Sequence, residues 1–410
     1  MGNKPIYLYI APFTPYDKSW RGGFFIDAAK ALIKDGRYDV RVLSLSRFAA
    51  DYEYEGIKIH RLTWVHIGGA AYFRTLLNWL NRRILKRRLM EIGVDVKDVA
   101  VCHVNDYSFF AHYALAFKKW NPNCFTILHH HYNGNYNLKI GSLGIVPIWS
   151  HLLYLRMRYE FEHADAHVFI SNLCKSNYCK AVPFDEGGIG TPLNETLPAG
   201  KWFRRIELKA SYVLYNGIDK EIFNQGDCGA RQKSGFVIGC VGNYNPCKSQ
   251  IDLIKAAEIL KNRIPGLKVR LVGTGMNIGI CKDYVAKHSL AEIVEFVPEM
   301  PHEKLPVFYR ELDLFVMPSV NEGFCCVNAE ANYCGVPAIA CKGLPFEELL
   351  DETDKERWLA APHNVQDFAE RIYSFYEHRW NQKLMVDLDS NLLIGKFLSW
   401  IDAKRQQVRV

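Results

Sequence analysis

The 410-residue sequence contains no apolar run of the roughly 18 residues that a membrane-spanning helix requires. Its first residues, MGNKPIYLYIAPF, hold too short an apolar stretch for a signal peptide and lack the Ser or Thr of a myristoylation signal. The 12 cysteines form no C-x-x-C pair and no cluster with histidine at metal-ligand spacing. We therefore expect reduced thiols, no bound metal and a cytoplasmic location.

Acidic residues are absent from Phe73 to Leu89, where the segment FRTLLNWLNRRILKRRL carries six basic ones. Its apolar side chains recur every three or four residues, which predicts a basic amphipathic helix. Such a helix is either a domain helix with a solvated basic face or a docking surface for an anionic membrane. Nucleic acid is not favoured, because no recognisable nucleic-acid-binding module accompanies the segment.

Two series of strands and helices follow each other along the chain. Short, almost continuously apolar segments such as PIYLYIAPF, VAVCHV and CFTILHHH alternate with helical ones such as GGFFIDAAKALIKDG. A Gly/Pro-rich stretch at 180–200 interrupts the alternation. SYVLYNGID follows, and the alternation then restarts with GFVIGCVG, LKVRLVG, IVEFVP and LDLFVMPS. Strands of this kind, separated by helices, indicate parallel sheets that are covered on both faces.

The predicted fold class is therefore α/β, with two Rossmann-like, doubly wound parallel-sheet domains. Because one hydrophobic core seldom supports 410 residues, we place an N-terminal domain at 1–212 and a C-terminal domain at 213–390. The last helix, about 391–410, is amphipathic, and we expect it to pack back onto the first domain. Two such domains facing each other would leave an interdomain cleft at the carboxyl ends of both sheets, where ligands bind in this architecture.

The sequence VGNYNPCKS at 241–249 comes close to a P-loop but has Cys247 where the second glycine belongs. A side chain there prevents backbone N–H groups from closing around a phosphate, so an ATPase or GTPase is not favoured. The strand, the tight turn at Gly242 and Lys248 at the entrance of a helix still predict an anion site. A solvated lysine at a helix start is the alternative for Lys248 taken in isolation.

A second glycine-rich turn, LVGTGMNIG at 271–279, is similar to a dinucleotide-binding fingerprint, but its third glycine comes one residue late. A near match of this kind is weak evidence by itself. Gly273 and Gly275 either satisfy a tight turn or let the backbone approach a phosphate or ribose.

Two glutamates, Glu322 and Glu330, stand eight positions apart in NEGFCCVNAEANYCGVPAIA. Gly323 loosens the turn before a helix that we expect to begin at Phe324–Cys325 and to end with Gly335 as its cap. Glu322 would then lie at the mouth of this helix and Glu330 about two turns further, beside free N–H groups at the positive end of the dipole. Such an arrangement suits a diphosphate flanked by a ribose and a sugar, which predicts a nucleotide-sugar site.

The segment EGFCCVNAEANYCGVPAIA closely resembles the E-G-F…E-A…G-x-P-V-V-A signature of glycosyltransferase family 4, retaining enzymes of the GT-B fold. The resemblance covers VLYNGID, CVGNYNPCKS, LVGTGM and LDLFVMPSVNEGF in the family's order, and more loosely WRGGFFIDAAKAL, VCHVNDY, TILHHH and ADAHVFIS. It extends over almost the whole chain and is weak from about 175 to 210. It implies a metal-independent transferase whose donor is a UDP- or GDP-sugar.

The resemblance also implies roles for individual residues. Glu322 would lie near the donor sugar, Lys248 would neutralise the diphosphate, and Glu330 would hold the ribose hydroxyls. His129 would reach the reaction centre, although His130 and His131 leave the register open. The other predicted donor-binding residues are Arg21, Gly22 and Gly23 in the first domain and Gly242, Asn243, Gly273, Gly275, Met300, Gly323, Phe324, Cys325 and Cys326 in the second.

Asn243 departs from the family, which usually has arginine after the glycine of this turn. A charge-assisted hydrogen bond contributes roughly 1.5–3 kcal/mol, so its loss would weaken diphosphate binding about ten- to a hundred-fold. We hypothesise that Arg21, beside the glycine pair, or another basic group replaces the arginine.

The expected reaction moves a sugar to an acceptor hydroxyl with retention at the anomeric carbon and without a cofactor. The segment Asp387-Leu388-Asp389 is expected to lie on the surface and not to bind metal. The basic helix and the predicted cleft suggest a lipid-linked or polysaccharide acceptor in cell-surface glycan synthesis, with the protein peripheral on the inner membrane face. The alternatives are a nucleotide-sugar epimerase or hydrolase of the same fold and a non-catalytic sugar-nucleotide-binding subunit.

Overall fold

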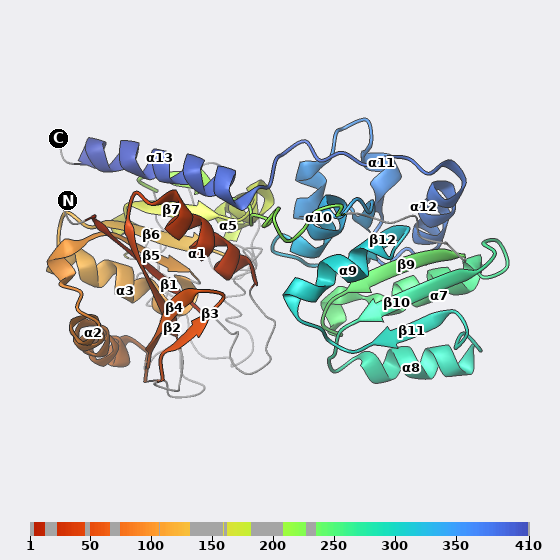
Figure 1. Cartoon of the computed structure of the whole chain (residues 1–410), viewed down its shortest axis with the longest axis horizontal. Helices are drawn as coiled ribbons and strands as arrows, with labels where there is room; N and C mark the ends of the chain where they lie inside the picture. Colours follow the sequence, from red (N-terminus) through yellow and green to blue (C-terminus); the bar gives the residue numbers. More distant parts are fainter. Residues whose placement is uncertain are drawn as a thin grey trace, which may run out of the picture. The chain divides into compact units, whose positions relative to one another are not determined.

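A computed structural model describes residues 4–12, 23–45, 50–65, 74–105, 107–131, 159, 162–181, 208–226 and 235–408. The chain divides into two compact units, Met1–Tyr215 with Asn391–Val410 and Asn216–Ser390 (Figure 1). Arg21 and Gly22, two of the predicted donor contacts, lie outside the described residues.

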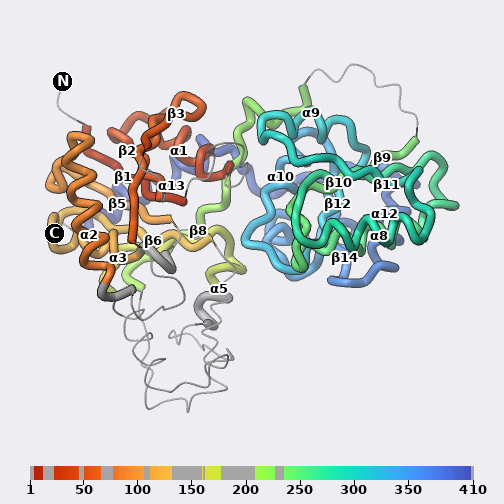
Figure 2. Tube along the Cα trace, turned by 90° about the horizontal axis from the view of Figure 1, so that it is seen from below, coloured from red at the N-terminus to blue at the C-terminus, as the bar shows by residue number. Residues whose placement is uncertain are grey.

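The first unit is built on an eight-stranded sheet of order β3-β4-β2-β1-β5-β6-β7-β8. Its strands are β1 (Ile6–Ala11), β2 (Asp39–Leu45), β3 (Tyr52–Tyr54), β4 (Ile57–Leu62), β5 (Val99–Asn105), β6 (Phe125–His130), β7 (Ala166–Phe169) and β8 (Ser211–Val213). Neighbouring strands are parallel except for β3 with β4. Figure 2 shows the central strands β1 and β5 side by side. Every residue of β5 and β6 is buried, which explains their nearly continuous apolar sequence.

Five helices and a 3-10 turn accompany this sheet among the described residues: α1 (Gly23–Asp35), α2 (Arg74–Glu91), η1 (Val96–Asp98), α3 (Tyr107–Trp120), α5 (Asn172–Ala181) and α13 (Ser390–Val408). Helix α1 ends at Gly36, whose φ of +77° is a conformation that glycine adopts without strain. Helix α13 returns to the first unit, where Asp402 accepts hydrogen bonds from Arg37 and Tyr38. Four of its side chains join the core of that unit: Ile394, Phe397, Leu398 and Ile401.

The second unit has a six-stranded, fully parallel sheet of order β11-β10-β9-β12-β13-β14. Its strands are β9 (Phe236–Val241), β10 (Leu267–Val272), β11 (Val294–Val297), β12 (Leu314–Met317), β13 (Ala338–Cys341) and β14 (Leu359–Ala360). Its helices are α7 (Gln250–Leu260), α8 (Ile278–Lys287), α9 (Leu305–Arg310), α10 (Cys326–Tyr333), α11 (Lys355–Trp358) and α12 (Val365–His378), with the 3-10 turns η3 (Pro246–Lys248), η4 (His302–Lys304) and η5 (Pro345–Leu349).

The two sheets confirm the predicted α/β class with two doubly wound units. In the second unit the strand order reverses at β9, which pairs with β10 on one side and with β12 on the other. Such a reversal leaves a crevice outside the carboxyl ends of the two strands, because the connections leave in opposite directions. The turn after β9 and the loop after β12 therefore occupy the place where ligands bind in this architecture.

Candidate functional site

A backbone hydrogen bond joins the two segments that leave the reversal point of the second sheet. The N–H of Val320, in the loop after β12, donates to the carbonyl of Cys247 in η3 at 2.8 Å. Asn245 caps η3 with its side chain, which accepts from the N–H of Lys248 at 3.1 Å. These bonds hold Lys248 and Glu322 beside each other although they are 74 positions apart in the chain.

Lys248 and Glu322 form an ion pair between Nζ and Oε1. Their side chains are 20% and 10% exposed, so the pair is largely shielded from solvent. Burial alone lowers the pKa of Lys248, but the Glu322 carboxylate outweighs burial and raises that pKa above its ordinary value. The ammonium is therefore charged at any physiological pH. Lys248 lies at the end of η3, two residues before α7 begins, at the entrance of that helix as the sequence predicted.

Helix α10 begins at Cys326, directly after the Glu322 loop. Cys325 is its N-cap, with the left-handed angles φ +66° and ψ +62°, and its side chain makes no capping hydrogen bond. Burial raises the pKa of the Cys325 thiol, so the thiol stays neutral. Phe324 is buried beneath this turn, and the Sγ of Cys326 accepts a hydrogen bond from Asn216 at 3.5 Å. The helix mouth thus lacks a side-chain cap of its own and adjoins the ammonium of Lys248.

Glu330 lies inside α10 with only 4% of its surface exposed. The hydroxyl of Tyr309 donates to its Oε2 at 2.8 Å, and Nε2 of His302 lies 3.0 Å from its Oε1. Burial, followed by the charge of Glu330, raises the pKa of Tyr309, so the phenol keeps the proton that it donates. A carboxylate has about four lone-pair positions. Glu330 is therefore held rigidly and can still accept hydrogen bonds from a diol.

Tyr309 and His302 are functional candidates that the sequence did not reveal. Met300, which was predicted to frame the base, is partly buried two residues before His302. Met300 and His302 belong to the connection from β11 to α9, and Tyr309 lies in α9 itself. No spacing rule relates these positions to Glu330. Only the packing of α9 against α10 makes the relation visible.

The two predicted glycines after β10 have a structural reason that does not involve a ligand. A Cβ atom on Gly273 would lie 2.2 Å from the carbonyl oxygen of Gly242, and one on Gly275 would lie 2.5 Å from that of Tyr244. Their φ angles, +142° and +147°, are also strained for any other residue. The amide of Gln250 donates to the carbonyls of Gly242 and Asn243 at 3.2 Å each. The turn that precedes Lys248 is therefore clamped from both sides.

In the first unit, the histidines that follow each other on β6 point to alternate faces of the sheet. His129 is buried, with its Nδ1 3.1 Å from Nε2 of His103. His130 lies on the other face, with its Nε2 3.0 Å from Nδ1 of His167. His131 follows the last residue of β6, and the ring of Phe24 stacks on it at 5.4 Å. Gly23 begins α1 immediately before Phe24, so this predicted donor contact lies near the carboxyl end of β6 together with His131.

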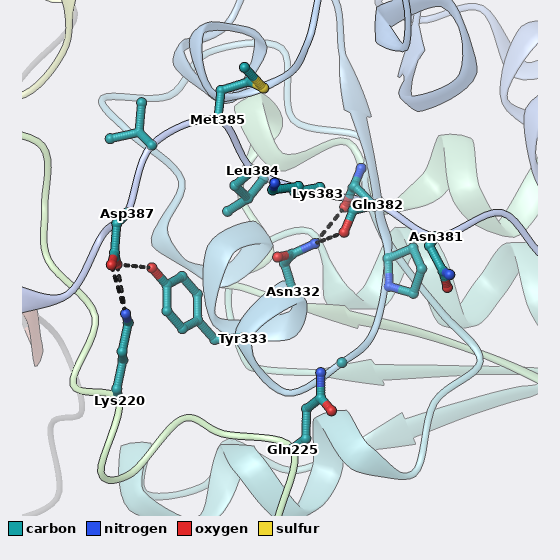
Figure 3. Close-up of a pocket in the computed structure, with 13 residues that line it drawn as sticks. Lys220, Gln225, Asn332, Tyr333, Asn381, Gln382, Lys383, Leu384, Met385 and Asp387 are labelled. Carbon is teal, nitrogen blue, oxygen red and sulfur yellow. Dashed lines mark hydrogen bonds and ion pairs between the residues drawn. The ribbon is translucent and has the colours of Figure 1, made fainter.

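Asp387 lies in a different place, an open pocket of about 760 Å³ in the second unit (Figure 3). Its carboxylate binds Lys220 at 2.8 Å and accepts a hydrogen bond from Tyr333 at 2.9 Å. None of the predicted site residues lines this pocket. Within the described ranges, no three His, Cys, Asp or Glu side chains are grouped closely enough to hold a metal ion.

Comparison with known proteins supports the fold, and the family match lies almost wholly in the second unit. Residues 228–391 match the family described as "Glycosyl transferases group 1". A D-inositol 3-phosphate glycosyltransferase of Mycobacteroides abscessus is 32% identical over 174 residues, which are 39% of this chain and 38% of that protein. The chain therefore aligns with less than half the length of the curated relatives that it matches.

Solved structures match over nearly the whole chain, at low sequence identity. A glycosyltransferase from Rickettsia africae has a TM-score of 0.69 at 14% identity, covering 98% of this chain and 99% of its own. Anabaena HepE in complex with UDP and glucose has a TM-score of 0.66 at 17% identity, covering 97% and 99%. The chain thus has the GT-B fold of these structures, and its segment 228–391 matches the group 1 glycosyl transferases.

Proposed function

We propose that this protein is a retaining glycosyltransferase of family 4 that transfers a sugar from a nucleoside-diphosphate sugar to an acceptor hydroxyl. The observation that carries the proposal is the ammonium of Lys248, held by Glu322 beside the uncapped mouth of α10. A diphosphate is the ligand whose charge and shape suit a buried ammonium next to helix N–H groups. The match of residues 228–391 to the group 1 glycosyl transferases supports the same assignment.

In the free protein Glu322 neutralises Lys248. When the diphosphate binds, Lys248 pairs with the β-phosphate, and Glu322 is released to bind sugar hydroxyls and to stabilise positive charge on the ring. Negative charge grows on the β-phosphate as the bond between it and the anomeric carbon breaks. Preorganised stabilisation of this charge by Lys248 and the α10 amides is the largest catalytic contribution.

The configuration is retained because the acceptor attacks from the face that the phosphate leaves. The bond from the anomeric carbon to the phosphate oxygen breaks, the bond to the acceptor oxygen forms, and the acceptor proton passes to the departing phosphate. Glu330, oriented by Tyr309 and His302, accepts hydrogen bonds from the ribose diol. The reaction as proposed uses neither a metal ion nor a cofactor.

The nucleotide of the donor is the first point to test. HepE was solved with UDP and glucose, which makes UDP-sugars the first candidates and GDP-sugars the second. The test is a screen of UDP- and GDP-sugars for release of nucleoside diphosphate, with glycan and lipid-linked acceptors, followed by assignment of the product's anomeric configuration by NMR. An inverted product would contradict the retaining mechanism.

The same screen without an acceptor separates the alternatives. Rapid release of nucleotide, or epimerisation of the sugar, would support an epimerase or hydrolase in place of a transferase. Tight nucleotide binding with no turnover on any acceptor would support a non-catalytic binding subunit.

We also propose that the exposed face of α2 docks on an anionic membrane surface that presents a lipid-linked acceptor. Trp79 and Met90 are 58% and 63% exposed on this helix, and they point the same way as three exposed basic residues: Arg83, Lys86 and Arg87. Glu91 offsets Arg87, with which it forms an ion pair at 3.0 Å. Apolar side chains amid cations favour the boundary between lipid headgroups and acyl chains. Among the described residues, no helix combines the length and apolar composition needed to cross a bilayer.

Co-sedimentation with vesicles tests the docking surface. We expect binding to vesicles that contain phosphatidylglycerol and none to pure phosphatidylcholine, with a blue shift of Trp79 fluorescence on binding. The double variant Arg83→Glu/Lys86→Glu abolishes binding, whereas Lys282→Glu/Lys287→Glu, on the exposed face of α8, does not. Equal binding by both double variants would exclude α2 as the docking surface.

A further inference from the structure

Two short hydrogen-bond chains in the first unit end beside each other at β6. One runs from Tyr7 through His103 to His129, and the other runs from Asn105 to His131. The rings of His129 and His131 lie 4.1 Å apart between their centroids. The positions of the protons along the two chains decide which chemical group these rings can bind.

The first chain begins at Tyr7, whose side chain is fully buried. Its hydroxyl lies 2.7 Å from Nδ1 of His103, a separation typical of an O–H donor. If Tyr7 accepted instead, its own buried hydroxyl proton would lack a partner among the described residues, whereas the far nitrogen of His129 lacks one in either case. Tyr7 is therefore the donor, and burial raises its pKa so that the phenol keeps its proton.

The proton of His103 follows from this assignment. A neutral imidazole carries one N–H and one bare nitrogen, so His103 is protonated on Nε2, which donates to Nδ1 of His129 at 3.1 Å. His129 is consequently protonated on its own Nε2. This N–H is buried and has no hydrogen-bond partner in the part of the chain that the structure describes. Burial lowers the pKa of both histidines, so both are neutral at pH 7.

The second chain fixes the tautomer of His131 so that its free nitrogen is an acceptor, whereas the free nitrogen of His129 is a donor. The Nδ2 of Asn105 donates to the carbonyl of Ile10 at 3.2 Å, which orients the amide and leaves its Oδ1 2.9 Å from Nε2 of His131. Because Oδ1 can only accept, Nε2 of His131 carries the proton. Its Nδ1 is then a bare acceptor, which also lacks a partner among the described residues. Burial lowers the pKa of His131 to about 3, so this nitrogen accepts a hydrogen bond without taking the proton.

We propose that Tyr7, His103 and Asn105 set these tautomers so that His129 and His131 form a donor–acceptor pair for one hydroxyl group of a carbohydrate ligand. A hydroxyl donates and accepts at once, whereas a carbonyl only accepts and an ammonium only donates. The assignment of the tautomers does not depend on the proposed function. The assignment of the hydroxyl to a sugar rests on the proposed function.

The place of the pair in the fold supports a ligand site. His131 follows the carboxyl end of β6, the edge at which doubly wound sheets bind ligands. Phe24 stacks on its ring at 5.4 Å and Phe25 meets it edge-on at 4.8 Å, which holds the ring in place. The hydroxyl belongs either to the donor sugar or to the acceptor. Tyr7, His103 and Asn105 touch neither, so they are positioning residues.

The first experiment measures the tautomers directly, in the full chain labelled with ¹⁵N-histidine. The imidazole ¹⁵N shifts are expected to place the protons of His103, His129 and His131 on Nε2. A proton on Nδ1 of His129 or of His131 would overturn the proposal, whatever reaction the protein catalyses.

The second experiment adds UDP-glucose, UDP or free glucose to the labelled protein. A shift of Nδ1 of His131 and Nε2 of His129 with UDP-glucose but not with UDP assigns the hydroxyl to the donor sugar. A shift with free glucose alone assigns it to the acceptor side. If none of the three compounds, added to saturation, changes the ¹⁵N chemical shift of either nitrogen, the hydroxyl site is refuted. A protein that releases no nucleotide from any donor would refute the proposed function and leave the tautomers standing.

Variants separate positioning from packing. Tyr7→Phe removes the hydroxyl that donates to His103, so mixed tautomers are expected at His103 and His129. The KM for the substrate that carries the bound hydroxyl should rise roughly three- to ten-fold. Tyr113→Phe, which removes a hydroxyl from another fully buried tyrosine of the same unit, is the control; its ring packs on His112, and the ¹⁵N shifts of His103 and His129 should stay unchanged. Identical histidine spectra for the two variants would contradict the proposal. His131→Phe keeps the stacking with Phe24 and is expected to lose about ten-fold in kcat/KM.

Discussion

Lys248 and Glu322 form an ion pair at the carboxyl edge of the second sheet, from opposite sides of the point where the strand order reverses. The ammonium that is proposed to bind a diphosphate is thus already occupied by a carboxylate in the free protein. Ligand binding must break this pair, so substitutions of its two members should have opposite effects on nucleotide affinity.

Glu322→Gln is expected to bind UDP about five-fold more tightly, or about 1 kcal/mol, because the carboxylate no longer competes for Lys248. Turnover should nevertheless fall a hundred-fold or more, since the group that positions and stabilises the sugar is lost. Isothermal titration with UDP and an assay of nucleotide release measure the two effects. Glu292→Gln, an exposed acid before β11, is the control.

Lys248→Ala is expected to reduce turnover a hundred-fold or more and to weaken UDP binding as well, because it removes the cation and leaves Glu322 to repel the diphosphate. The same titration and assay apply. A turnover close to the wild-type rate in either Lys248→Ala or Glu322→Gln would remove the pair from the catalytic site.

The ribose contact should depend on Tyr309, which donates to Glu330 from within the buried part of the unit. Wild-type protein is expected to prefer UDP over 2′-deoxy-UDP, and Glu330→Gln should lose most of this preference. Tyr309→Phe should retain part of it, because His302 still contacts the carboxylate. Competition binding with the two nucleotides measures the preference. Equal preference in wild type and Glu330→Gln would place the ribose elsewhere.

The glycines after β10 should matter for folding more than for chemistry. Gly273→Ala and Gly275→Ala are each expected to lower the free energy of unfolding by about 3 kcal/mol or more, because the new Cβ meets backbone at positive φ. Gly279→Ala, in α8 with nothing within 4 Å of its Cβ, should instead raise it by about 0.5–1 kcal/mol. Urea denaturation compares the three, and a tolerated Gly273→Ala would show that the 242–244 turn can move away.

The buried histidines should make the first unit sensitive to acid. Burial lowers the pKa of His103, His129 and His130 in the folded protein, so the unfolded chain binds more protons as the pH falls below about 6.5. The free energy of unfolding of the first unit should therefore have its full value above that pH. Below it, this free energy should decline by about 1.4 kcal/mol per pH unit for each histidine, until the pKa of that histidine in the folded protein is reached. Hydrogen exchange between pH 7.5 and 5 reports the two units separately. Stability of the first unit that does not change over this range would contradict the burial of these rings.

Arg21 is our proposed substitute for the arginine that the family has at the position of Asn243. Arg21→Ala should weaken UDP binding about ten- to a hundred-fold, the loss expected for a charge-assisted hydrogen bond. Arg87→Ala, an exposed arginine of α2, controls for a general change in charge. Unchanged UDP affinity in Arg21→Ala would mean that another group, or none, replaces the family's arginine.

The elements of this fold were predictable from sequence because their signals are local. Continuous apolar strands, the glycine that ends α1 and the cap at Gly335 each depend on residues a few positions apart. The order of the motifs and the spacing of Glu322 and Glu330 likewise pointed to a nucleotide-sugar site before any contact was known.

What the sequence could not provide is the set of partners at that site. The strand order β11-β10-β9-β12-β13-β14 is not sequential, so the turn after β9 meets the loop after β12 only in the folded unit. This contact brings Lys248 and Glu322 together as an ion pair. The packing of α9 on α10 places the hydroxyl of Tyr309 where it donates a hydrogen bond to Glu330. In the first unit, successive side chains of β6 point to opposite faces of the sheet, which separates His129 from His130. The hydrogen bonds from Tyr7 on β1 through His103 on β5 decide which nitrogen of His129 carries the proton. Hydrogen bonds act over about 3 Å, and residues distant in the chain come within that reach only through tertiary structure.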